Sequence, residues 1–313
     1  MRRPGLAPLT ALILLFAGLL AFGQNQSAPD ASPTPPADSP QPDLTPDANG
    51  KLSERQMQDL RQVVMEHYRA NYAKRRDYTY TVRKVENKLD GKGEIKSSES
   101  KTYEVMELYG EPVERLIAKD DKPLSGKDAA KEEEEIEKLT NQRKNESAED
   151  RAQRRAEEEK QREKNREFVR EVADAYDFRL VGSEMLNGRD TWVIAGEPRA
   201  GFQAHLKDAQ ILPKYHGRLW IDKSELQLVK LDVEAIDTVS FDWILARIHK
   251  GTRLVIEQTR VNEEVWLPQH LRFRLDARVA LFKSYNEEYE DTFRDYKKFR
   301  ATTKIVSVGD VKP

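Results

Sequence analysis

Apolar and polar residues alternate with a period of two over most of the second half of the chain. The clearest stretch is 215–235, YHGRLWIDKSELQLVKLDVEA, in which Lys230, Asp232 and Glu234 alternate with apolar residues. This period places one set of side chains on a buried face and the other in water, as in a half-buried β-strand. The short polar turn 222–225 would join two such strands into an antiparallel hairpin.

The same alternation, interrupted by turn residues, predicts strands elsewhere in the chain. They fall at 77–89, 101–108, 113–119, 191–196, 243–249, 253–261, 265–282 and 289–299, and a further strand begins at 178–182 and runs to the hairpin-turn signal Asn187-Gly188. With the hairpin they make about eleven strands, and helices do not alternate with them as they would in a parallel sheet. The pattern predicts an α+β fold built on one meandering antiparallel sheet with one face in water.

A spacing of three and four residues predicts an amphipathic helix over 52–72. Ser53 and Gln56 fit a capping box at its start, and Leu52 with Met57 fits a hydrophobic staple across that box. The apolar side of this helix has to pack against another element.

A charged segment over 127–171 interrupts the alternating pattern. Well over half of its residues are charged, with both signs mixed, and it contains neither glycine nor proline. Many weak ion pairs at i,i+4 spacing can hold a solvated helix, so we expect one long helix or a helix pair that projects into water. A partner-binding arm and a disordered segment are the alternatives. Only its end, near Phe168 and Val172, has the apolar residues needed to dock on the sheet.

The amino-terminal residues are expected to lie outside the folded domain. Residues 1–23 combine Arg2 and Arg3, a short apolar run and a small-x-small site, which is typical of a cleaved secretory signal peptide; an uncleaved anchor is the alternative. Residues 24–50 are rich in Pro, Ser and Asp, and we expect a disordered linker there. The domain then spans 51–313, with the charged insertion inside it.

Composition narrows the classes of function. The chain has no cysteine, which excludes disulfides and a cysteine-linked lipid anchor. Its formal net charge of −2 argues against nucleic acid as a partner. A nucleophile elbow, a phosphate loop, a dinucleotide-binding turn and a His-Glu-x-x-His motif are all missing from the sequence. We therefore expect no catalytic, cofactor-binding or metal-binding residues, and a protein that is not an enzyme.

The order of the predicted elements resembles the LolA/LolB-like superfamily of periplasmic lipoprotein carriers. The stretches that carry the resemblance are LRQVVMEHYRANYAKRRDYTYTV, NGRDTWVI, GRLWIDKSELQLVKLDVEA and VWLPQHLRFRL. The resemblance implies a periplasmic protein with a strongly curved antiparallel sheet, an incomplete barrel wrapped over helices, and an apolar cavity for acyl chains. The chain departs from the family at Glu111, where the carriers favour a basic residue before the proline, and in its charged insertion.

The tryptophans fall in separate predicted strands, where they would either fill the sheet core or line such a cavity. In the second interpretation the irregular segment 200–212 covers the cavity mouth. The candidate cavity and lid residues are then Trp192, Phe202, Leu206, Trp220, Trp243, Trp266 and Phe273.

These patterns lead to two hypotheses for function. The first is a periplasmic carrier that shelters a lipid or the acyl chain of a lipoprotein, without catalysis. The alternative is an envelope protein that binds a partner protein or senses stress through the charged helix.

Overall fold

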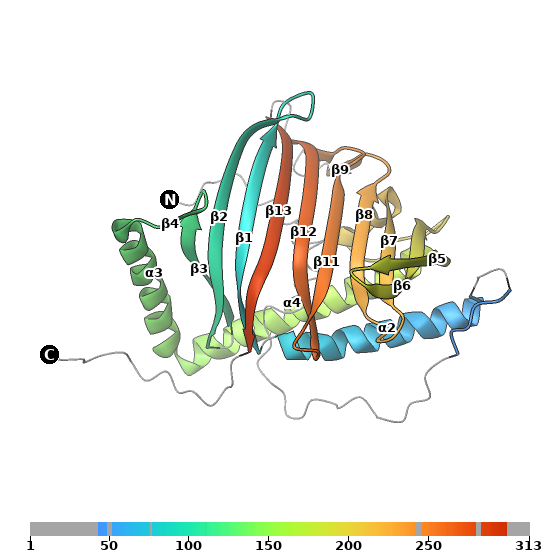
Figure 1. Cartoon of the computed structure of the whole chain (residues 1–313), viewed down its shortest axis with the longest axis horizontal. Helices are drawn as coiled ribbons and strands as arrows, with labels where there is room; N and C mark the ends of the chain where they lie inside the picture. Colours follow the sequence, from blue (N-terminus) through green and yellow to red (C-terminus); the bar gives the residue numbers. More distant parts are fainter. Residues whose placement is uncertain are drawn as a thin grey trace.

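The computed structural model describes residues 43–48, 52–75, 77–109, 111–241, 246–279 and 283–298. The predicted signal peptide, most of the predicted linker and Trp243 lie outside these residues. One antiparallel sheet of 13 strands dominates the described part of the chain. Figure 1 shows it as one curved, open layer, with α2 and α4 crossing its lower end and α3 beside β3 and β4. The predicted α+β class with an open, curved antiparallel sheet is confirmed.

The helices and strands have the following bounds. The helices are α2 (Glu54–Arg75), α3 (Gly126–Lys144), α4 (Ala148–Ala175) and the 3₁₀ helix η1 (Lys207–Lys214). The first strands are β1 (Tyr78–Leu89), β2 (Ile95–Leu108), β3 (Glu111–Lys119), β4 (Lys122–Pro123), β5 (Tyr176–Leu186), β6 (Arg189–Pro198) and β7 (Tyr215–Asp222). The remaining strands are β8 (Leu228–Ala235), β9 (Val239–Phe241), β10 (Ala246–Ile248), β11 (Arg253–Val261), β12 (Val265–Val279) and β13 (Lys283–Lys298).

The strand order brings the two ends of the domain together in the middle of the sheet. Along the sheet the order is β4-β3-β2-β1-β13-β12-β11-β8-β7-β6-β5, and β10 pairs with both β12 and β9. The first long strand, β1, therefore pairs with the last, β13. Along this order the described sheet has two outer edges, one at β3 and β4 and the other at β5, while β9, which pairs with β10, ends a short side branch.

The charged segment forms the helices α3 and α4, and α3 covers the edge of the sheet at β3. Ser125 and Ser147 cap them, each through a side-chain oxygen that accepts a backbone N–H. Glu132 of α3 accepts a hydrogen bond from the backbone N–H of Leu116 at 2.8 Å. The Glu132 side chain thus satisfies a backbone donor of β3 that would otherwise be free to pair with another strand.

Helix α2 begins as the sequence predicts. The Ser53 backbone N–H donates to Gln56 Oε1 at 2.9 Å and the Gln56 N–H donates to Ser53 Oγ at 3.3 Å, which is the reciprocal bonding of a capping box. The Gln56 side-chain amide also donates to the carbonyls of Asp43 and Thr45. Leu44, within the predicted linker 24–50, is buried in the hydrophobic cluster beneath α2.

Two large hydrophobic clusters form most of the core. One joins the apolar faces of β7, β8, β11, β12 and β13 and includes the fully buried Leu275. The other packs Leu60 of α2 against Ile194 and Ile221 of the sheet. Among the described residues, no helix has the length and apolar character that a membrane span requires.

Candidate functional site

A groove of about 670 Å³ lies between the amino-terminal half of α2 and strand β5. Its volume is within the range of small-molecule binding sites. The residues that line it are Leu52, Glu54, Met57, Gln58, Arg61, Tyr176, Asp177, Phe178, Arg179, Leu180 and Arg199.

The spacing of these residues explains the shape of the groove. Glu54, Met57, Gln58 and Arg61 follow the i, i+3, i+4, i+7 pattern, which places them on one side of α2. The strand contributes five consecutive residues, 176–180, although alternate side chains of a strand point to opposite faces. The groove therefore follows the outer edge of β5, which pairs only with β6 in the described sheet.

The floor of the groove is apolar and continuous with the core. Leu52, Met57, Phe178 and Leu180 are half-buried and pack against the cluster beneath α2. The Tyr176 hydroxyl donates to the Leu212 carbonyl at 2.8 Å, and burial raises the pKa of this phenol, so it stays neutral. A ligand on this floor would meet aliphatic side chains and two neutral aromatic rings, those of Tyr176 and Phe178.

The rim of the groove carries charged side chains, and their partners differ. Arg199 Nε lies 2.8 Å from Asp177 Oδ1, so these two charges are paired. Arg61 donates only to the Ala173 carbonyl, at 3.4 Å, among the contacts of the described residues. Arg179 is exposed and has no hydrogen-bond or ion-pair partner within the described chain. Positive charge is therefore available at the rim, with Glu54 as the remaining carboxylate.

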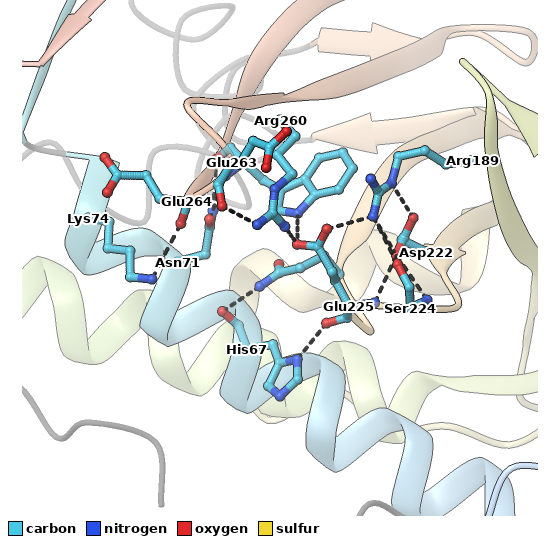
Figure 2. Close-up of polar contacts among 12 residues, drawn as sticks. His67, Asn71, Lys74, Arg189, Asp222, Ser224, Glu225, Arg260, Glu263 and Glu264 are labelled. Atoms are coloured by element: carbon cyan, nitrogen blue, oxygen red, sulfur yellow. Dashed lines mark hydrogen bonds and ion pairs between the residues drawn. The ribbon is translucent and has the colours of Figure 1, made fainter. Parts of the chain in front are cut away.

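A network of polar contacts fixes the carboxy-terminal half of α2 to the sheet (Figure 2). Asn71 is buried, and its side-chain amide donates to the Trp266 carbonyl at 2.8 Å while its oxygen accepts the Trp266 N–H at 2.6 Å. His67 Nδ1 lies 2.7 Å from the Glu225 carbonyl, and because a carbonyl only accepts, Nδ1 carries the proton. Gln227 returns a hydrogen bond to the His67 carbonyl at 2.9 Å. We call these contacts and the ion pairs around Glu225 the polar lock.

The carboxylate of Glu225 is the centre of the polar lock. It accepts a hydrogen bond from Arg189 Nη2 at 2.5 Å and one from the indole N–H of Trp266 at 2.9 Å. It also forms an ion pair with Arg260. Arg189 also binds Asp222 and lies over the Trp266 ring, with 5.1 Å between the guanidinium carbon and the ring centroid. Charge-assisted bonds of this kind are stronger than neutral ones, so the lock joins the 222–227 turn firmly to β12.

The environment of Asp222 favours its charged form. Burial raises the pKa of this carboxyl, but hydrogen bonds from Arg189 and Ser224 and the charge of Arg189 outweigh that effect, so the pKa lies below its usual value. Within the described ranges, no group of His, Asp or Glu side chains is arranged to hold a metal ion. The contacts of the lock join α2 and the 222–227 turn to the sheet, and the groove is the candidate site for a ligand.

The structure distributes the residues predicted to line a cavity over four hydrophobic clusters. Trp192 packs beneath α2, Trp220 and Trp266 pack together beside Val193, and Phe273 lies in the cluster of β11 to β13. Phe202 and Leu206 pack where the end of α4 meets η1. None of these six residues lines the groove. The cavity lining that the sequence suggested stays a prediction, and the groove is a site that the sequence analysis missed.

Comparison with known proteins finds likeness only among solved structures. No family model matches the chain, and no curated protein matches it. A putative outer membrane lipoprotein-sorting protein domain from Vibrio parahaemolyticus aligns at 12% identity and a TM-score of 0.32, over 78% of this chain and 95% of that one. A LolA superfamily protein from Nitrosomonas europaea aligns at 10% identity and a TM-score of 0.26, over 71% and 86%. The MucA/MucB complex of Pseudomonas aeruginosa provides a match at 11% identity and a TM-score of 0.20, over 75% and 92%.

Proposed function

We propose that this protein is a periplasmic binding protein that shelters an acyl chain, from a lipid or a lipoprotein, in the groove between α2 and β5, without catalysis. The observation that supports the proposal is the apolar floor of the groove, which continues into the core and opens to solvent at a charged rim. Such a site suits a ligand with a hydrocarbon part and a polar end. The predicted signal peptide supports the periplasmic location.

Hydrophobic burial supplies enough free energy for this function. Each buried methylene contributes about 0.8 kcal/mol, so a chain that buries about ten of them gains about 8 kcal/mol before the cost of association. The polar lock holds the other half of α2 in place, so the groove is formed before the ligand enters. A preformed site loses less free energy on binding than one that must become ordered.

Native mass spectrometry after gentle extraction tests the proposal, together with titration of a fluorescent fatty-acid probe. We expect co-purified lipid and saturable probe binding, and we expect Phe178→Asp to remove both, because it places a charge on the apolar floor. Met185→Asp is the matched control, since Met185 is on the same strand, is 64% exposed and does not line the groove. A protein that is empty and ignores the probe would refute the proposal.

A second function, the binding of a partner protein or stress sensing, is favoured by the surface of α3. No residue of α3 is buried, so the charges of this helix are available to a partner. Charge reversal at Lys127 and Lys138, both exposed, tests this function without disturbing the contacts of Glu132 with β3. If α3 is the recognition surface, a partner captured by the wild-type protein is lost in the double variant while probe binding persists.

A further inference from the structure

We infer that the ligand of the groove is a single-chain fatty carboxylate, whose head group binds Arg61 and Arg179, the two rim arginines that form no ion pair with the described residues. This inference rests on the proposed function and narrows its ligand from any acyl chain to one that ends in a negative charge. The rim of the groove carries the evidence for it.

The charges that line the groove leave a surplus of one positive charge. Three of the lining residues are arginines and two are carboxylates, so the formal sum is +1, in a chain whose formal net charge is −2. Arg199 and Asp177 neutralise each other at 2.8 Å. Among the lining residues this leaves two arginines, Arg61 and Arg179, and one carboxylate, Glu54. One carboxylate head group would balance the surplus.

The two remaining arginines also have free hydrogen-bond donors. A guanidinium offers five N–H groups in a fork that matches a carboxylate. Arg61 uses one of them for the Ala173 carbonyl, and Arg179 uses none within the described chain. Because Arg61 is half-buried, a carboxylate bound to it would be partly shielded from water, which strengthens the interaction.

The apolar floor and the arginines lie on the same two elements, which fixes how the ligand lies. Met57 precedes Arg61 by one helical turn on α2, and Phe178 and Leu180 flank Arg179 on β5. A hydrocarbon chain on Met57 and Phe178 therefore has Arg61 one helical turn away, while Arg179, whose side chain leaves β5 on the face opposite Phe178, lines the groove from the open edge of the strand. The geometry combines a site for the chain with a site for the head group.

The experiment compares palmitate with hexadecanol, which has the same chain length and no charge, as competitors of the fluorescent probe. We expect palmitate to compete at a concentration lower by about tenfold or more, the factor that corresponds to one charge-assisted hydrogen bond. Raising the salt concentration should reduce this preference, because the rim is open to solvent. A second arm uses palmitoyl lysophosphatidate, and tighter binding of this phosphate ligand than of palmitate would overturn the assignment to a carboxylate.

Variants separate the head group from the chain. In Arg61→Gln with Arg179→Gln, palmitate binding should weaken by about tenfold or more while hexadecanol binding changes by less than about twofold. Arg170→Gln is the control, because Arg170 is an exposed arginine of α4 outside the groove. Arg179→Lys should recover part of the palmitate affinity, since the charge remains and the fork is lost.

The failures of the two proposals are distinguishable. Equal binding of palmitate and hexadecanol to the wild-type protein leaves the sheltering of an acyl chain intact and overturns the inference about the head group. Absence of binding by all three ligands refutes the proposed function itself. Hydrogen exchange of the backbone amides of 176–180 gives a third outcome. If the protein binds no fatty acid and a peptide protects these amides from exchange, the groove binds a peptide as an additional β-strand. That result would overturn the inference.

Discussion

The two halves of α2 are held against the sheet in different ways. The amino-terminal half rests on apolar contacts and borders the groove, with Met57 half-buried on its floor. The carboxy-terminal half is joined to the sheet by directional bonds, above all the two between Asn71 and the Trp266 backbone. Apolar contacts tolerate small shifts, whereas hydrogen bonds fix distance and direction. The polar lock therefore fixes the position of α2, so this helix stays ordered while the groove beside its amino-terminal half stays open.

The largest effect on this comparison is expected from the change Asn71→Leu. It leaves both the N–H and the carbonyl of Trp266 buried without their partner, and each such group costs about 1–3 kcal/mol. We expect the free energy of unfolding to fall by about 2–4 kcal/mol in urea denaturation. Gln58→Leu, at an exposed position in the amino-terminal half of α2, is the control and should change it by less than about 0.5 kcal/mol. Equal losses in the two variants would remove the distinction between the halves.

A smaller effect is expected from acid. The folded-state pKa of Asp222 is lowered, so its contribution to stability is present above the usual pKa of the carboxyl and is lost as the pH falls through the folded value. The free energy of unfolding should therefore fall below about pH 4, near the pKa of an unperturbed aspartate. Asp222→Asn should show a shallower fall, measured by urea denaturation between pH 3 and 7. An identical slope in both proteins would show that Asp222 does not contribute to the lock.

The change Phe178→Ala is expected to affect binding more than stability. Phe178 is half-buried at the edge of the core, so its truncation should lower the free energy of unfolding by about 1 kcal/mol. Binding of the fatty-acid probe should weaken by about tenfold, because the ligand loses apolar contact area. Chemical denaturation and probe titration measure the two quantities. A loss of stability as large as that of Asn71→Leu would place Phe178 with the lock instead of the groove.

The smallest effect is expected from Glu54→Gln. Glu54 is exposed at the start of α2 and lines the groove, so its removal should leave stability within about 0.5 kcal/mol. Palmitate affinity should rise by about two- to threefold, because a like charge near the head group is gone. Glu66→Gln, on the same helix and outside the groove, is the control and should leave the affinity unchanged. A fall in affinity would contradict the placement of the head group.

The sequence predicted local features better than those that join distant segments. The Ser53 and Gln56 box placed the start of α2, and Asn187-Gly188 predicted the β5–β6 turn, where both residues adopt the positive φ angles of a tight hairpin. Strands β4 and β9 were missed because two or three residues carry no measurable period.

The groove could not be predicted because it depends on which strand lies at the edge. Arg61 and Arg179 are far apart in the sequence, and no local pattern shows that β5 ends the sheet. Trp192 and Trp220 illustrate the same difficulty. In the β6–β7 register Trp192 pairs with Ile221 and Val193 pairs with Trp220, so the two indoles point to opposite faces. The sequence showed that the tryptophans lie in strands. The face of the sheet on which each one lies depends on the strand register, which the sequence did not show.

The bond between Glu132 and Leu116 has a consequence for any shortened form of this protein. Without α3, the outer edge of β3 would expose backbone hydrogen-bond donors and acceptors to solvent. A strand of a second molecule could then pair with this edge. Removal of α3 would then lead to dimers or fibres of subunits that are otherwise well folded. Glu132 of α3 thus occupies a backbone donor of β3 that would otherwise be open to pairing with another molecule.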